Sequence, residues 1–217
     1  MEILSGKKRV QLDEPGFAER LARHDGLWID LGCGDAKFTF RTAIQHPDIL
    51  VLGLDAAREP MVPQAVRARR SPKKGGAPNL ILAAAAVEDL PDMLRHRAET
   101  VSINFPWGSL LRAIVMAEQP ILASICQLLR PAGSLDILLN DSLYAQPHVY
   151  EKMNLVRIDQ EHLETITAPA LTQSDLDVQA IETIPNHDIP VHTSWGRRLA
   201  DSHPDGKTWH ISALRQP

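Results

Sequence analysis

Carboxylates and glycines are spaced around residue 30 in a way that is typical of a ligand-binding turn. The segment 30–35 (Asp-Leu-Gly-Cys-Gly-Asp) follows a short apolar run, and Asp55 follows the next apolar run. Glycine has no Cβ, so a ligand can approach the backbone of such a turn closely. Carboxylates on both sides of the turn would repel a phosphate, but they would suit the ammonium of an amino-acid moiety. The turn is therefore expected to bind a cationic ligand.

The ligand that best meets these requirements is S-adenosylmethionine (SAM), which carries an ammonium and a sulfonium and has no phosphate. Asp55 ends a second strand, where an acid can accept hydrogen bonds from both ribose hydroxyls. Glu88 follows a third strand and could reach the adenine of the ligand. The alternative interpretation is that Glu88 is a solvated acid in a loop. A dinucleotide fold or an accidental Gly-x-Gly is the alternative for the turn, but the sequence has no G-x-G-x-x-G pattern. We therefore predict SAM as the cofactor and S-adenosylhomocysteine as its product.

A second group of residues, 104–111 (Asn-Phe-Pro-Trp-Gly-Ser-Leu-Leu), follows a fourth strand, at the sheet edge where substrates of open α/β proteins bind. Trp107 offers a broad aromatic face, and Trp195, in a late loop, could close the other side of a flat substrate. Stacking on an aromatic ring contributes about 1–3 kcal/mol per base. For either tryptophan the alternative is a core anchor. Their loop positions favour a clamp for an extruded base, so both are candidate catalytic residues.

Basic residues cluster in a chain whose formal net charge is −4. The clusters are Lys7, Lys8 and Arg9; Arg67, Arg69, Arg70, Lys73 and Lys74; and Arg197 and Arg198. The net charge argues against non-specific coating of nucleic acid, but steering depends on where charges lie rather than on their sum. Each residue alone could be no more than a solvated charge. Their clustering favours contacts with nucleic-acid phosphates.

Alternating apolar runs and amphipathic stretches predict the elements that must position these residues. We expect strands at 27–31, 49–54, 79–83, 101–105, 134–140 and 208–214, and helices at 13–24, 37–45, 57–70 and 110–129, the last with a potential break at 119–120. Such alternation with short connections predicts a doubly wound α/β sheet with right-handed crossovers. The glycine turn, Asp55 and the tryptophan segment would then meet at one edge of the sheet.

Length and composition bound the organisation of the chain. Its 217 residues suffice for a single domain with a full core. Residues 1–12 are expected to form a short arm or hairpin, and the acidic segment 145–190 an insertion-like region of one or two helices and long loops. The two cysteines lie far apart without metal-ligand spacing, which favours a reduced cytoplasmic protein with no metal site. No apolar run has the length of a signal or a membrane span.

The sequence resembles the Kam/Npm family of 16S rRNA (adenine-1408-N1) methyltransferases, which give aminoglycoside resistance. The likeness covers most of the chain and is clearest in the segments 6–11 (GKKRVQ), 30–37 (DLGCGDAK), 54–56 (LDA), 74–80 (KGGAPNL), 106–112 (PWGSLLR) and 193–195 (TSW). The Pro-Trp-Gly-Ser-Leu-Leu run and the late Ser-Trp are the specific parts, because many methyltransferases share the glycine motif. The resemblance implies a class I SAM-dependent methyltransferase fold: Rossmann-like, with a mostly parallel seven-stranded sheet and helices on both faces.

The resemblance also implies roles for individual residues. Trp107 and Trp195 would hold the flipped adenine, and the basic residues would dock on the assembled 30S subunit. The expected SAM contacts are Asp30, Gly32, Gly34, Asp55, Ala56, Ala86, Glu88, Asn104, Ser109 and Thr193, with Ser109 and Thr193 near the reacting methyl group. The expected RNA contacts are Lys7, Arg9, Arg67, Arg70, Lys73, Lys74, Arg197, Arg198 and Lys207. The sequence departs from the family in two places. Segment 145–190 matches the family poorly. Lys207 stands where the family prefers arginine, so a bidentate contact would be lost there.

Methylation at adenine N1 needs no catalytic base, because N1 already carries a lone pair; the enzyme must unpair the base, aim it at the methyl carbon and exclude water. The runner-up activity is tRNA guanine-N7 methylation, whose enzymes also carry a Phe-Pro-x-x-Trp segment after the fourth strand. Segment 105–107 (Phe-Pro-Trp) lacks the intervening residues. A SAM- or RNA-binding module without turnover is the alternative from another class. The expected enzyme is a monomeric cytoplasmic protein whose partner is 16S rRNA within the 30S subunit.

Overall fold

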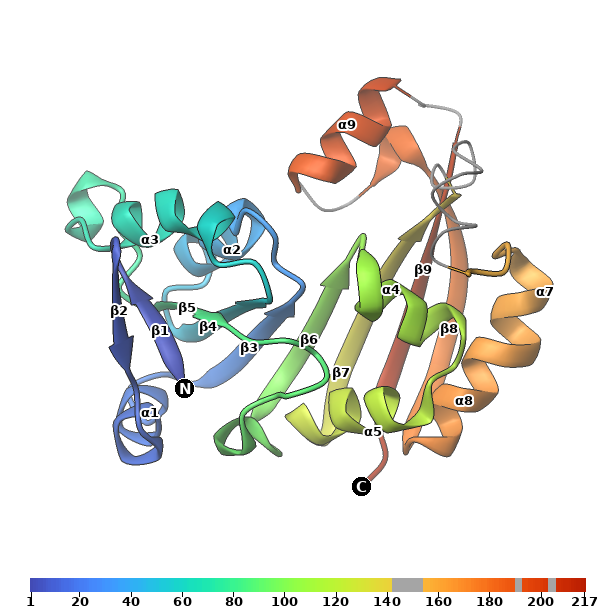
Figure 1. Ribbon diagram of the computed structural model, residues 1–217, viewed down its shortest axis with the longest axis horizontal. Helices are drawn as coiled ribbons and strands as arrows, with labels where there is room; N and C mark the ends of the chain where they lie inside the picture. Colours follow the sequence, from blue (N-terminus) through green and yellow to red (C-terminus); the bar gives the residue numbers. More distant parts are fainter. Residues whose placement is uncertain (142–153, 190–192, 203–205) are drawn as a thin grey trace.

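The computed structural model describes residues 1–141, 154–189, 193–202 and 206–217 (Figure 1). Nine strands form one sheet in the order β2-β1-β5-β4-β3-β6-β7-β9-β8. The strands are β1 (Glu2–Ser5), β2 (Lys8–Gln11), β3 (Gly26–Leu31), β4 (Ile49–Asp55), β5 (Leu80–Ala84), β6 (Ala98–Asn104), β7 (Leu129–Asn140), β8 (Leu176–Pro185) and β9 (Lys207–Arg215). The central strands β3 to β7 are parallel, whereas the pairs β1–β2, β1–β5, β7–β9 and β8–β9 are antiparallel.

The expected α/β architecture is confirmed, with two more strands than the expected seven. The seven correspond to β3 through β9, and the N-terminal hairpin β1–β2 extends the edge of the sheet. Its attachment is narrow, because Ile3 of β1 pairs with Ala83 of β5 in one bridge. Ile3 and Ala83 are far apart in the sequence and meet through backbone pairing, so no local sequence pattern predicts this attachment.

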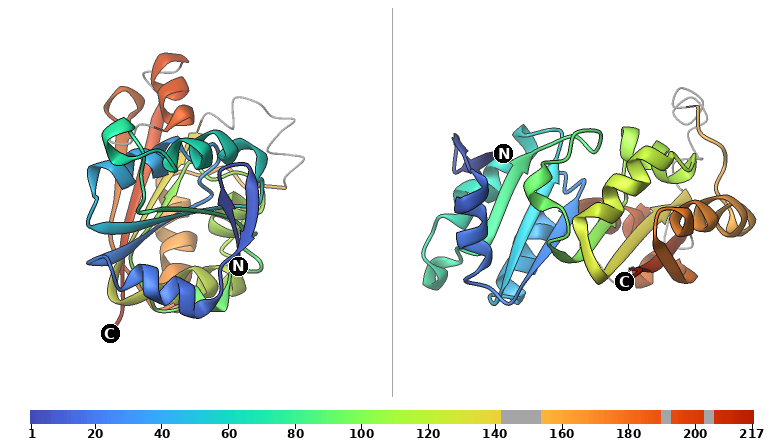
Figure 2. Two further views of the ribbon diagram at one scale, coloured as in Figure 1. Left: turned by 90° about the vertical axis from the view of Figure 1, so that its left-hand side faces the viewer. Right: turned by 90° about the horizontal axis from the view of Figure 1, so that it is seen from below.

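Helices cover both faces of the sheet, as expected. They are α1 (Glu14–Leu21), α2 (Lys37–Gln45), α3 (Val62–Ala68), α4 (Gly108–Val115), α5 (Gln119–Leu128), α7 (Gln160–His162), α8 (Ala168–Gln173) and α9 (Ser194–Ser202). A π-helical turn, Leu163–Thr167, joins α7 to α8. Phe40 of α2 and Ala65 of α3 belong to one buried cluster, whereas Phe17 of α1, Ile114 of α4 and Leu171 of α8 belong to another. Figure 2 shows the two groups of helices on opposite sides of the twisted sheet.

The expected break in the helix after β6 is confirmed. α4 and α5 meet at an angle of 105°, and Pro120 occupies the first turn of α5, where its missing N–H is tolerated. No single helix within the described ranges is long and apolar enough to cross a membrane. The α4–α5 pair passes that test only when both helices are taken together, and most of its apolar residues are buried in the core.

Two expectations are corrected. Part of segment 145–190, expected to contain only helices and loops, forms the ten-residue strand β8, which completes the sheet as its edge. As an edge strand it carries exposed polar residues such as Gln179 and Glu182, and these weaken its apolar pattern. Trp195 lies in the first turn of α9 rather than in a loop. Residues 142–153 lie outside the described ranges.

Candidate functional site

The glycine turn connects β3 to α2 in a conformation that requires glycine. Gly32 and Gly34 have φ values of +75° and +55°, which favour glycine because they lie in the left-handed region. The backbone N–H of Gly34 donates to Asp55 Oδ2 at 2.8 Å, so the turn is joined directly to the end of β4. A Cβ on Gly34 would meet no atom within 4 Å, which shows that the turn borders open space. The glycine turn and Asp55, which the sequence analysis assigned to the same ligand, are thus joined by a hydrogen bond.

Asp30 lies buried beneath this turn, with 2% of its surface exposed. Thr39 Oγ1 donates to Asp30 Oδ2 at 2.5 Å, and Ser102 Oγ and Asn104 Nδ2 approach Oδ1 at 3.4 and 3.3 Å. Burial raises the pKa of Asp30 to about 6, against the opposing effect of these hydrogen bonds. Asp30 is thus fixed in position, and its charge depends on pH close to neutrality.

Two cavities adjoin the glycine turn at the carboxyl ends of the parallel strands. The larger, of about 310 Å³, is lined by Gly32, Gly34, Asp55, Ala56, Ala86, Glu88, Trp107 and Ser109, among others. The other, of about 270 Å³, is lined by Asp30, Gly32, Gly34, Asp35, Asn104, Thr193 and Trp195, among others. Because both contain Gly32, Gly34 and Phe105, they form one cleft across the turn. All ten residues expected to contact SAM line this SAM cleft, where their contacts with the cofactor stay a prediction.

The chemistry of the cleft fits SAM. Asp55 accepts from Gly34 and, at 2.7 Å, from the backbone N–H of Ala57. Since a carboxylate has about four acceptor positions, room remains for two ribose hydroxyls. In the larger cavity the Ser109 hydroxyl hydrogen-bonds to Glu88 and lowers the pKa of that exposed carboxyl. Glu88 is therefore ionised at neutral pH and can accept from an amino group such as that of adenine.

Trp107 and Trp195 meet at the end of this cleft. Both line a hollow of about 20 Å³ together with Phe105, Pro106, Leu111, Leu139 and Asn140. Trp107 and Trp195 are 56% and 42% exposed, unusually high values for tryptophan, so neither is a core anchor. Trp107 ends the connection before α4, and Trp195 comes from α9, which lies above the ends of the strands in Figure 1. The fold thus brings together two tryptophans that are 88 positions apart in the sequence (107 and 195).

Comparison with known proteins identifies the family. A family model described as NpmA, 16S rRNA (adenine(1408)-N(1))-methyltransferase, matches residues 2–214. This chain belongs to that family. It is 30% identical over 204 residues to the 16S rRNA (adenine(1408)-N(1))-methyltransferase of Streptoalloteichus hindustanus, with 93% of each chain covered. The family match favours rRNA over the tRNA guanine-N7 alternative.

Solved structures of related methyltransferases share the whole fold. A tryptophan-to-alanine variant of the 16S rRNA (adenine(1408)-N(1))-methyltransferase from Catenulisporales acidiphilia, with its cosubstrate SAM, has a TM-score of 0.91 and 33% identity, covering 100% of this chain and 97% of that one. The aminoglycoside resistance methyltransferase NpmB1 has a TM-score of 0.86 and 30% identity, covering 99% and 98%. This chain is therefore a class I SAM-dependent methyltransferase, as predicted.

The structure of this methyltransferase adds a contact that the sequence did not reveal. Ser194 Oγ, at the start of α9, donates to Asp35 Oδ2 at 2.7 Å, and Lys37 Nζ lies 2.8 Å from the same oxygen. Partial burial acts to raise the pKa of Asp35, but the hydrogen bonds from Lys37 and Ser194 outweigh it and hold that pKa below its usual value. The glycine turn is thereby tied to the helix that carries Trp195. The sequence analysis placed this segment in a loop. A signal that could have revealed α9 is Thr193, whose Oγ1 accepts from the Gly196 N–H at 2.8 Å as a helix cap does.

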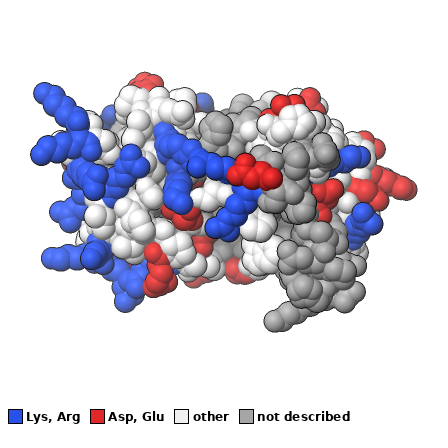
Figure 3. Space-filling model, turned by 90° about the horizontal axis from the view of Figure 1, so that it is seen from above, with Lys and Arg blue, Asp and Glu red and all other residues white. Residues whose placement is uncertain are grey.

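The residues expected to bind RNA lie on several exposed segments of the methyltransferase. Figure 3 shows Lys and Arg gathered over the end formed by β1, β2 and α3. Some of these residues have partners within the protein: Arg9 lies 3.5 Å from Glu2, and the Arg67 guanidinium lies 4.5 Å from the Phe40 ring centroid. Lys207 begins β9 on the far side of the sheet, where its carbonyl accepts from Asn140 of the tryptophan hollow at 3.0 Å. The expected contacts are thus divided between one end of the molecule and the surroundings of the hollow.

Proposed function

We propose that this enzyme transfers the methyl group of SAM to N1 of adenine 1408 in 16S rRNA within the assembled 30S subunit, and thereby confers aminoglycoside resistance. The observation that carries the proposal is the position of Trp107, which lines both the larger cavity of the SAM cleft and the hollow shared with Trp195. A base held by the two rings would lie directly beside the ligand in the cleft. Family membership gives the base its identity.

The chain's own residues would hold the cofactor in one orientation. Asp55 and Glu88 line the cavity suited to the adenosine part, and Asp30 and Asp35 line the cavity suited to the ammonium. When bound, SAM supplies a methyl group on a positively charged sulfur, which leaves with the electron pair of the broken carbon–sulfur bond. Ser109 lines the first of these cavities and Thr193 the second, and both would border the reacting methyl group.

The two tryptophans would perform the catalytic work by positioning the base. The hollow between them has room for about one water molecule, so a base enters only when the rings move apart. The N1 lone pair then forms the new bond to carbon, and no proton has to be removed. The adenine becomes cationic, and a cation between aromatic faces gains about 0.5–2 kcal/mol. Substrate positioning in a site that excludes water is the source of the rate enhancement.

Primer extension on 30S subunits treated with enzyme and SAM tests the proposal. N1 methylation blocks base pairing, so we expect a reverse-transcription stop at adenine 1408 and, in cells that express the enzyme, decreased aminoglycoside susceptibility. A stop at another nucleotide, or methyl incorporation into tRNA but not into 30S subunits, would contradict it. Calorimetric SAM binding with no transfer to any ribosomal substrate would instead favour the binding module.

The proposal includes a monomer that acts in the cytoplasm. One chain supplies every residue predicted to contact SAM and both tryptophans predicted to hold the base, and this supports a monomer. A 30S substrate requires access to ribosomes. Sedimentation at the concentrations used in the methylation assay would reveal a dimer, if one forms.

A further inference from the structure

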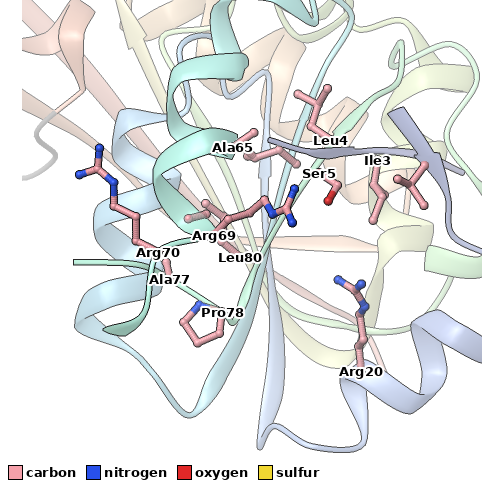
Figure 4. Close-up of a pocket in the computed structure, with 13 residues that line it drawn as sticks. Ile3, Leu4, Ser5, Arg20, Ala65, Arg69, Arg70, Ala77, Pro78 and Leu80 are labelled. Atoms are coloured by element: carbon pink, nitrogen blue, oxygen red, sulfur yellow. The ribbon is translucent and has the colours of Figure 1, made fainter. Parts of the chain in front are cut away.

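A separate cavity of about 280 Å³ lies between the N-terminal hairpin, α3 and the start of β5 (Figure 4). It shares no lining residue with the SAM cleft or the tryptophan hollow. Its floor is apolar and includes Leu4 of β1, Leu80 and Leu82 of β5, all at most 9% exposed. Arg20 at the end of α1 and Arg69 after α3 stand at its rim. We call it the arginine cavity.

The arginines of this cavity have no carboxylate partner in the part of the chain that the structure describes. Among the described residues, eight lysine and arginine side chains form ion pairs with carboxylates, but no such pair involves Arg20, Arg69 or Arg70. Figure 4 shows the Arg69 guanidinium reaching towards Ser5 of the hairpin and Arg20 rising from α1 towards the same space, while Arg70 turns outward. Each guanidinium offers five N–H donors, whose fork matches the oxygens of a phosphate. The rim is therefore complementary to an anion.

The geometry of Arg69 is held in place by the turn of the hairpin. Gly6 has a φ of +63°, and a Cβ built on it would lie 3.4 Å from Arg69 Cδ, so the side chain packs against the turn. The loop that follows Arg70 is fixed as well, because the Gly76 N–H donates to Ser71 O and the Ala77 N–H to Ala68 O, both at 3.1 Å. Donors fixed before binding lose less conformational freedom when a ligand arrives.

We infer that the arginine cavity binds one nucleotide of the RNA backbone, with its phosphate on Arg20 and Arg69 and its ribose against the apolar floor. A bare phosphate would leave the floor unused, and an apolar ligand would leave the guanidiniums without partners. The cavity opens at the end of the molecule over which Lys and Arg gather in Figure 3, next to Arg70, Lys73 and Lys74. This inference rests on the proposed function, since it extends the footprint of the same rRNA substrate beyond the base clamp.

The test is equilibrium binding of 30S subunits without SAM, so that methyl transfer plays no part. The double variant Arg20→Ala/Arg69→Ala should bind about tenfold more weakly than wild type. The magnitude of the slope of log K against log salt should fall by about 1, because the contact with one phosphate is lost. The matched control is Arg23→Ala, which removes an exposed arginine of the same region that pairs with Glu19 and does not line the cavity. SAM affinity should be unchanged in both variants.

A second variant guards against loss of folding. Arg69→Lys keeps the charge but not the planar fork, so its 30S affinity should fall between those of wild type and the double variant. Binding by the double variant equal to that of Arg23→Ala, in affinity and in salt slope, would overturn the inference. So would arginine-dependent binding of adenosine monophosphate together with unaltered 30S binding, because the cavity would then belong to a free nucleotide.

The test of the arginine cavity and the test of the proposed function can fail independently. Arginine-dependent 30S binding by a wild-type enzyme that leaves adenine 1408 unmethylated would refute the proposed function and support the arginine cavity. Methylation at adenine 1408 by wild type and by the double variant, with the same KM for 30S subunits, would support the function and refute the cavity.

Discussion

At the scale of single residues, binding of the cofactor and binding of the base fall to different side chains. Trp107 contributes an exposed ring to the wall of the SAM cleft, whereas carboxylates and backbone groups supply the polar contacts there. Replacing Trp107 by Ala should therefore leave SAM affinity within a few-fold of wild type. Transfer to 30S subunits should fall by about 5- to 150-fold, the equivalent of a lost stacking energy of about 1–3 kcal/mol.

Calorimetry with SAM and a single-turnover methylation assay measure the two effects of Trp107→Ala. Trp107→Phe is the matched variant, because it retains a smaller aromatic face and should recover part of the rate. A loss of SAM affinity as large as the loss of rate would mean that Trp107 holds the cofactor rather than the base.

Asp30 gives the cofactor site a pH dependence. Its pKa of about 6 in the free protein means that Asp30 is largely protonated at pH 5 and largely ionised at pH 7. The ammonium of SAM stays protonated over this range, since α-amino groups titrate near 7.7–8.0. SAM affinity should therefore rise as pH increases from 5 to 7. Asp35, whose pKa is below its usual value, stays ionised throughout and cannot produce this change.

Calorimetric titration of SAM between pH 5 and 7 measures the effect of Asp30. The Asp30→Asn variant keeps the shape of the side chain but not its charge, and should show weaker binding with a flat pH profile. An Asp30→Asn profile that still rises with pH would assign the titration to another group.

At the scale of elements, one small group of polar contacts joins α9 to the glycine turn. Ser194 joins it to Asp35, and Lys37 Nζ lies 3.2 Å from the Ser194 hydroxyl. A hydrogen bond to a charged group is worth about 1.5–3 kcal/mol when well shielded, and less in this partly exposed position. Ser194→Ala should thus lower kcat/KM for 30S subunits by about 3- to 10-fold by loosening Trp195.

The readouts for Ser194→Ala are methylation kinetics, SAM affinity and thermal unfolding. SAM affinity and the melting temperature should change little, and Ser194→Thr should restore most of the rate because it keeps the hydroxyl. Ser124→Ala, which removes a hydroxyl that donates to the Pro120 carbonyl within α5, is the control. Equal rates for Ser194→Ala and Ser124→Ala would show that the tether does not position Trp195.

The elements also show which features the sequence can predict. The helix at 37–45 was predicted with the boundaries of α2, and the strands that end at the glycine turn and Asp55 were found, because their signals are local. β8 was missed because an edge strand needs little apolar pattern when β9 supplies its hydrogen bonds. The pairing of Ser194 with Asp35 spans 159 positions, and Arg20 and Arg69 meet only around a cavity. Such contacts form only in the folded protein, so no residue spacing in the sequence predicts them.

At the scale of the whole molecule, charge is distributed unevenly around a net value of −4. Basic residues gather over the end formed by β1, β2 and α3, and others lie on α9, above the carboxyl ends of the strands (Figures 1 and 3). A negative total weakens attraction to nucleic acid in general, whereas separated basic groups favour a partner whose phosphates are spaced to meet them. We therefore expect the enzyme to recognise the shape of an RNA surface rather than its sequence.

This arrangement predicts a strong preference for assembled 30S subunits over protein-free 16S rRNA. In the subunit the phosphates near the target base are held in place, so one rigid protein can reach them from α3, the hairpin and α9 together. Free RNA would have to be ordered during binding, and the associated loss of conformational freedom opposes binding. We expect at least about 100-fold faster transfer to 30S subunits than to the free RNA at equal concentrations, because only the free RNA has to be ordered during binding. Comparable initial rates on the two substrates would show that a local hairpin around the target base suffices for recognition.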